Sequence, residues 1–180
     1  EVAEVEGIGA INFLSIDDLP ISSEGEVIDQ KSIIALPTQI DLPILPTISR
    51  EPDDPFLKQL SKSGQCWVIL TSEDGVPLLA MHADGCLRAA VFEKNKPFEP
   101  YQFCHRPIIT EDSNETVGEL IYKLKLKDRK EQESDNAIKH DVILLWSDQK
   151  RIITGSDLLG RLIKGITNTE IVSEVEPAGV

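Results

Sequence analysis

Basic residues are scarce in this sequence. Its 180 residues include 18 lysines and arginines against 31 aspartates and glutamates, which gives a net charge of −13 at pH 7. Proteins that bind DNA, RNA or anionic membranes need a basic surface, so we expect no nucleic-acid partner. No apolar run approaches the ~20 residues that cross a bilayer, and we expect no membrane insertion.

The sequence is also poor in cysteine and lacks the common catalytic motifs. Cys66, Cys86 and Cys104 are an odd number without close spacing, which favours reduced thiols and a cytoplasmic location. Cys104 and His105 match no zinc-ligand spacing, and no glycine-rich phosphate loop is present. The sequence therefore predicts no metal site and a protein that is not an enzyme.

What the sequence does contain is an internal duplication, in which each half is predicted to run helix, strand, turn, strand, helix. In the first half, Asp54 and Pro55 start a helix that Gly64 ends, and two strands follow at residues 66–71 and 76–81. In the second half, the helix start is predicted from a capping-box-like segment at residues 112–115, and strands follow at residues 142–146 and 151–154. Asp84 aligns with Asp157, and Arg88 then aligns with Arg161.

The end of the second half carries the clearest pattern, a short strand that runs straight into a helix. Thr154 and Asp157 flank the junction, where helical N–H groups lack intrahelical partners. Such side chains either cap the helix or face a ligand, because this helix end also carries a partial positive charge. The apolar residues of the helix recur at helical spacing: Leu158, Leu159, Leu162, Ile163 and Ile166.

The remaining segments connect these two units. The acidic start of the chain is expected to form a β arm, with strands near residues 10–16 and 26–28, and three Leu-Pro dipeptides at residues 36–46 predict an extended connector. We expect an α/β (α+β) fold of two small units packed sheet to sheet with pseudo-two-fold symmetry. The expected division is arm 1–43, first repeat 44–95, linker 96–106, second repeat 107–167 and tail 168–180.

The duplication and the segment Ile152-Ile153-Thr154-Gly155-Ser156-Asp157-Leu158-Leu159 resemble the CBS domain pair, or Bateman module, over about residues 44–167. Thr154-x-x-Asp157 stands where that family carries Thr/Ser-x-x-Asp. The first half keeps the aspartate in Met81-His82-Ala83-Asp84 but lacks the hydroxyl residue. The two predicted sites are therefore unequal.

The resemblance implies a cleft between the repeats that binds an adenosine-type ligand, AMP, ADP, ATP or S-adenosylmethionine. Asp157 would accept hydrogen bonds from the ribose hydroxyls, and Thr154 would steady ribose or phosphate. The other residues expected around the two sites are Ile109, Thr110, Asp141, Val142, Arg151, Arg161, His82, Asp84 and Arg88.

Two functions of different classes follow from this reading. The first is a regulatory module that senses such a ligand and signals to an unknown protein effector, as a homodimer with the helices of one chain against those of the next. The alternative is a ligand-free scaffold or dimerisation module with a degenerate cleft.

Overall fold

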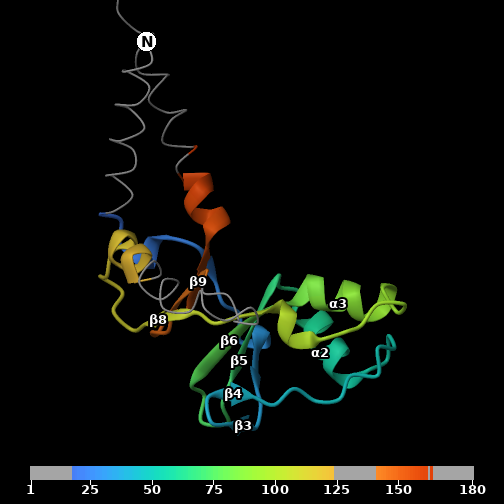
Figure 1. The fold of residues 1–180 in the computed structure, drawn as a ribbon. Coiled ribbons are helices and arrows are strands. Elements are labelled where there is room, and N and C mark those ends of the chain that lie inside the picture. Colours follow the sequence, from blue (N-terminus) through green and yellow to red (C-terminus); the bar gives the residue numbers. More distant parts are fainter. Residues whose placement is uncertain (1–17, 124–140, 162, 164–180) are drawn as a thin grey trace, which may run out of the picture.

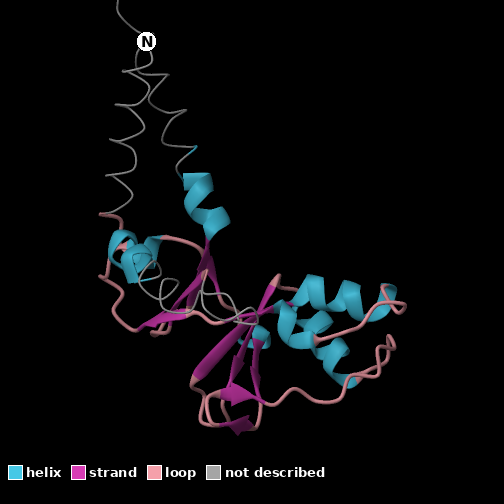
Figure 2. Cartoon of the chain, in the orientation of Figure 1, coloured by secondary structure: helices cyan, strands magenta, loops and turns pink. Residues whose placement is uncertain are grey.

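A computed structural model of the protein describes residues 18–123, 141–161 and 163, and the strands of these residues form two four-stranded sheets and one two-stranded sheet (Figure 1). Helices pack against the outer side of each large sheet, and the two sheets face each other (Figure 2). The predicted strand at residues 10–16 lies outside the described residues.

The first sheet has the order β2-β5-β6-β7. Strand β2 (Ile33–Ala35) runs parallel to β5 (Trp67–Thr71), which forms an antiparallel hairpin with β6 (Pro77–His82). Strand β7 (Cys104–His105) completes the edge, antiparallel to β6. Both central strands are near-continuous apolar runs and most of their residues are buried, as expected for a sheet that is covered on both faces.

The two helices of the first unit follow the sequence signals closely. Helix α2 (Pro55–Ser63) begins after Asp54, whose Oδ1 accepts from the N–H groups of Phe56 and Leu57, and it ends at Gly64 in the left-handed conformation. Helix α3 (Ala83–Phe92) continues directly from β6. Both helices pack on the sheet through a buried cluster that includes Phe56, Leu57, Leu60, Leu70, Leu79, Met81 and Cys86.

The second sheet has the order β1-β10-β9-β8. Strand β8 (Ile108–Thr110) runs parallel to β9 (Val142–Leu145), and β10 (Arg151–Thr154) is antiparallel to β9 and to β1 (Glu26–Val27). One helix occupies residues 117–123, and a second begins at residue 155.

The helix over residues 117–123 has a different cap from the predicted one. The capping box is formed by Thr116 and Glu119, because each donates its backbone N–H to the other's side chain. Asp112 instead accepts from the N–H of Asn114 within the preceding turn. The spacing of the box was recognised, but its position was wrong by four residues.

One edge strand of each sheet comes from the chain segment that directly precedes the other unit. β1 precedes β2 in the chain but lies in the second sheet, and β7 precedes β8 but lies in the first. The strand predicted near residues 26–28 is therefore present, while β7 and β2 fall in segments assigned to the linker and the arm. Local periodicity cannot reveal this exchange, because each edge strand pairs with residues distant in sequence.

The two sheets share an apolar layer, which confirms the predicted sheet-to-sheet packing. Ile69 and Ala80 of the first sheet contact Val142, Leu144 and Ile152 of the second, all of them buried. Trp67 and Trp146 pack against the rim of this layer and are partly buried. The layer runs along the middle of these strands, and Val142 at the start of β9 belongs to it.

The Leu-Pro segment is extended, as predicted, and folds back on itself as strands β3 (Thr38–Gln39) and β4 (Leu42–Pro43). Short 3-10 turns complete the described chain: η1 (Ile21–Ser23), η2 (Gln30–Ser32) and η3 (Pro100–Phe103).

Candidate functional site

Thr154 and Asp157 meet at the junction of β10 and the helix that begins at residue 155. The backbone N–H and the hydroxyl of Thr154 both donate to Oδ2 of Asp157, at 2.7 and 2.8 Å. Both residues are half-buried. Within the described part of the chain, Oδ1 of Asp157 has no hydrogen-bond partner. The carboxylate therefore caps the helix with one oxygen and keeps the other as an acceptor.

A second carboxylate, that of Glu24, lies beside this junction. The register of β1 on β10 brings Glu24 towards the Thr154 end of the strand, and its side chain is only 8% exposed. Oε1 of Glu24 lies 3.8 Å from Nε of Arg161, whose side chain is half exposed. Sequence reasoning missed Glu24, because only the pairing of a distant edge strand places it here.

Arg151 has a structural task at the same strand. Its Nε donates to the carbonyl oxygen of Ser22 at 3.0 Å, and Nη1 donates to that of Gly25 at 3.3 Å. These bonds fasten the N-terminal segment to β10. The guanidinium group of Arg151, which was expected to bind a ligand, therefore donates to two backbone carbonyls instead.

Two of the residues expected around this site, Val142 and Asp141, lie at this end of the sheet. Val142 pairs with Thr154 across the hairpin and is buried. The neighbouring Asp141 places Oδ1 2.5 Å from Nδ1 of His105, which belongs to β7 of the other sheet. This contact joins the two units beside the candidate site.

The other two expected residues lie further away along the strand. Thr110 pairs with Leu145, at the opposite end of β9 from Val142, and its Oγ1 accepts from the N–H of Asp112. Ile109 lies between the two ends and its side chain is 43% exposed. The fold separates Thr110 from Asp157 by the length of the strand.

In the first unit, His82 occupies the position that Thr154 has in the second. Trp67 pairs with His82 as Val142 pairs with Thr154, and both residues directly precede a helix. Nδ1 of His82 accepts from the N–H of Gly85 at 3.0 Å, so the ring caps α3. This ring nitrogen is therefore occupied by the helix cap and is not free to bind a ligand.

The register of the two halves therefore differs from the sequence alignment by one residue. Gly85, and not Asp84, stands where Asp157 stands, and Met81 lies buried in β6 opposite Val68. The predicted alignment of Asp84 with Asp157 was wrong by one residue. The apolar pattern of the sequence did not reveal the error, because it fits the strands and helices in either alignment. The first unit thus has neither the hydroxyl nor the carboxylate at the corresponding positions.

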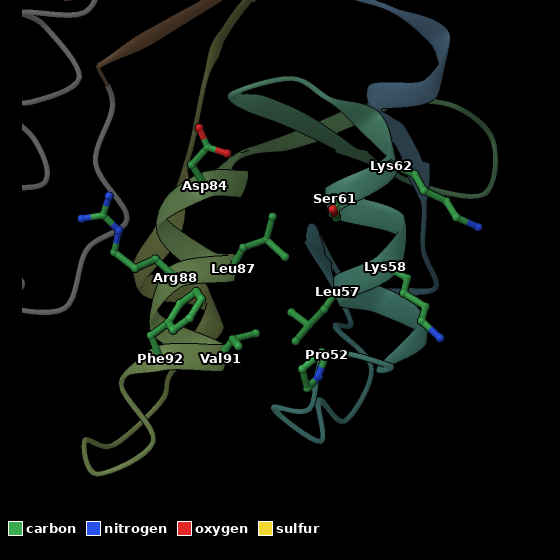
Figure 3. Close-up of a pocket in the computed structure, with 10 residues that line it drawn as sticks. All are labelled: Pro52, Leu57, Lys58, Ser61, Lys62, Asp84, Leu87, Arg88, Val91 and Phe92. Atoms are coloured by element: carbon green, nitrogen blue, oxygen red, sulfur yellow. The ribbon is translucent and has the colours of Figure 1, made fainter.

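Asp84 and Arg88 lie on a different surface from His82. Oδ2 of Asp84 accepts from the thiol of Cys66 at 3.3 Å, and both Asp84 and Arg88 line a groove between α2 and α3 (Figure 3). The ring of His82 turns instead to the rim between the sheets, where it contacts the edge of Trp67. The residues predicted for the first site are therefore divided between two places.

Neither a metal centre nor a membrane helix is found in the described part of the chain. No three His, Cys, Asp or Glu side chains gather there to hold a metal ion. Among the described helices, none has both the length and the apolar character needed to cross a bilayer.

Both units share one plan, a lead strand parallel to an antiparallel hairpin, with a helix before the hairpin and another after it. That is the element order expected of a CBS domain pair. The fold is of the CBS type.

No family model and no curated protein matches the sequence. The chain is similar to the solved CBS domain of a bacterial CNNM/CorC family Mg²⁺ transporter in complex with ATP, at 12% identity over 88% of this chain and 96% of that one, with a TM-score of 0.49. It is also similar to an uncharacterized conserved protein from Pyrococcus horikoshii, at 16% identity over 91% and 98% of the two chains, with a TM-score of 0.41.

Proposed function

We propose that this CBS-type protein is a regulatory module that binds an adenosine-type ligand, AMP, ADP, ATP or S-adenosylmethionine, at the junction of β10 and the following helix. The observation that carries the proposal is the carboxylate of Asp157. Thr154 holds its Oδ2 in place, while Oδ1 has no partner among the described residues. A fixed, acceptor-only group suits the paired hydroxyls of a ribose.

Two further features of the junction support a nucleotide. The first N–H groups of a helix favour phosphate oxygens, and the half-exposed Arg161 lies at the same helix. The sheets of both units meet beside this junction. A ligand that prefers one arrangement of the units would shift their equilibrium and so pass a signal to a protein effector. The homodimer and the effector remain predictions.

The alternative is a ligand-free scaffold, and one observation favours it. Asp157 already serves as a cap, and Arg151 is engaged with backbone carbonyls. Neither residue needs a ligand to explain its place in the fold.

A thermal-shift titration of the full chain with AMP, ADP, ATP and S-adenosylmethionine separates the two functions. A ligand at ~100 times its Kd stabilises the folded state by ~2.7 kcal/mol. We expect Asp157→Asn to abolish this shift, because the amide keeps an oxygen for Thr154 but presents a donor in place of the free acceptor. The matched control is Glu119→Gln in the capping box of the other helix, which should leave the ligand shift intact.

Each contrary result has a distinct meaning. If no ligand raises the melting temperature at millimolar concentration, the scaffold is the better account. If Asp157→Asn retains the shift, the ligand binds elsewhere.

A further inference from the structure

Glu24 is a buried carboxylate with few hydrogen bonds. Its side chain is 8% exposed. Oε1 accepts from the hydroxyl of Ser23 at 3.3 Å and lies 3.8 Å from Nε of Arg161, which is too far for a hydrogen bond. Oε2 has no partner within the part of the chain that the structure describes. A buried charged group without donors is costly to the fold, so this carboxylate calls for an explanation other than packing.

The segment that carries Glu24 is attached to β10 on both sides of this residue. Arg151 of β10 donates to the carbonyl oxygens of Ser22 and Gly25. Gly25 also lies so close to the strand that an added Cβ would be 2.1 Å from the carbonyl oxygen of Ile152. These contacts hold the backbone of Glu24 at a fixed place beside β10, so its carboxylate is preorganised in the absence of any ligand.

Glu24 and Asp157 lie at the same junction. The register of β1 on β10 places Glu24 at the Thr154 end of the strand, where Thr154 donates to Asp157. Arg161, which lies beside Glu24, follows Asp157 by four residues, so the two side chains lie on one face of their helix. The junction therefore combines two carboxylates with one half-exposed guanidinium, whereas the guanidinium of Arg151 is bound to backbone carbonyls.

We propose that Glu24 determines which adenosine-type ligand binds at this junction, an inference that rests on the proposed function. The buried carboxylate favours a ligand that brings hydrogen-bond donors or positive charge, and it disfavours a chain of phosphates. S-adenosylmethionine, which carries an ammonium and a sulfonium group, therefore binds in preference to ATP. AMP and ADP, with one and two phosphates, fall between these two ligands.

The positive groups at the junction do not cancel this preference. The start of the helix and Arg161 attract a phosphate, but Oε1 of Glu24 already lies beside the guanidinium and Asp157 adds a second negative charge. A chain of phosphates would meet both carboxylates, and like charges repel strongly where water is largely excluded. An ammonium group would instead supply the donor that Oε2 of Glu24 lacks, in a charge-assisted hydrogen bond.

The proposal is tested by calorimetric titration of the full chain with S-adenosylmethionine and with ATP, both without divalent metal ions. The unaltered protein should bind S-adenosylmethionine roughly tenfold more tightly than ATP. Glu24→Gln keeps the size of the side chain and removes its charge, so it should weaken the binding of S-adenosylmethionine and strengthen that of ATP. Glu24→Asp keeps the charge and should keep the order of the ligands. Glu26→Gln removes the same charge from an exposed residue of the same segment and should leave both affinities unchanged.

Three results would overturn this inference and leave the proposed function standing. One is binding of ATP to the unaltered protein as tightly as S-adenosylmethionine. Another is an equal loss of both affinities in Glu24→Gln, which would show a purely structural role. The third is the same change of preference in Glu26→Gln, which would attribute it to the overall charge of the chain. Binding of neither ligand to the folded, unaltered protein would instead reject the proposed function and this inference together.

Discussion

The thiol of Cys66 donates a hydrogen bond to Oδ2 of Asp84 across 3.3 Å, from the residue before β5 to the first turn of α3. Both side chains are exposed. This hydrogen bond, together with partial burial and the negative charge of Asp84, raises the pKa of the Cys66 thiol. An accessible cysteine is therefore kept in its protonated, less reactive form.

We expect Asp84→Asn to speed the alkylation of Cys66 severalfold, because loss of the carboxylate lowers the pKa of the thiol and increases the thiolate fraction. Iodoacetamide labelling at pH 8, read by mass spectrometry, measures the rate. Cys86 and Cys104 serve as internal controls, since burial raises their pKa to about 11 and about 12, and they should react only on unfolding. An unchanged rate at Cys66 would show that access, and not the carboxylate, limits its reaction.

Asp54 should contribute to the loss of stability in acid. Burial alone would raise the pKa of this carboxyl, but hydrogen bonds from the N–H groups of Ser49, Leu57 and Phe56 and the hydroxyl of Ser49 outweigh it and lower the pKa. A lowered pKa stabilises the fold above the unfolded value of about 3.9, and this stabilisation is lost as the pH falls through the folded value.

Urea unfolding at pH 7 and pH 3 tests this prediction. Asp54→Asn keeps one oxygen for the helix N–H groups but puts a donor in place of Oδ2, which accepts from the N–H and the hydroxyl of Ser49. It should therefore lower the stability at pH 7 and reduce the difference in stability between the two pH values. Asp53→Asn is the control, because it alters the exposed neighbouring carboxylate. It should show the same pH dependence of stability as the unaltered protein. An identical pH dependence in Asp54→Asn would exclude Asp54 as a contributor.

Gly25 is required where the segment before β1 passes close to β10 of the second sheet. Its φ is +67°, and an added Cβ would lie 2.1 Å from the carbonyl oxygen of Ile152 and 2.5 Å from Cγ1 of Ile153. Gly25→Ala should therefore destabilise the protein by about 2 kcal/mol or more, because it adds a clash with β10 to the backbone strain.

Gly75 provides the matched control for Gly25. Its φ is +81°, and nothing lies within 4 Å of an added Cβ. Gly75→Ala should cost only the backbone strain, about 1 kcal/mol. Chemical denaturation of both variants measures the difference, and equal losses would show that the contact with β10 adds nothing.

The cap between Thr154 and Asp157 should contribute measurably to stability without any ligand. Asp157→Ala removes the acceptor of two hydrogen bonds and should cost about 1 kcal/mol. Thr154→Val removes only the hydroxyl bond and should cost less. Urea unfolding gives both values, with Glu119→Ala in the Thr116–Glu119 capping box as a reference for an ordinary cap. A loss near zero for Asp157→Ala would leave the ligand as the only reason for the carboxylate.

Much of the fold could be predicted wherever the decisive contacts are local. Asp54, Pro55 and Gly64 mark both ends of α2 because capping depends on residues within one helical turn. The same applies to Thr154 and Asp157, which were recognised as a pair and do bond to each other. Where two short patterns competed, as with the capping box at Thr116, local rules placed the helix start incorrectly.

The sequence by itself determined the duplication, the apolar strands and the pairing of Thr154 with Asp157, because each depends on spacing along the chain. Only the tertiary structure decided which edge strand joins which sheet, and with it the positions of Glu24 and His105 beside the junctions of the other unit. The tertiary structure also separated Asp84 and Arg88, which lie at the groove between α2 and α3, from His82 at the rim between the sheets. The physical reason is that strand pairing and helix packing join residues far apart in the chain, and no local pattern records such partners.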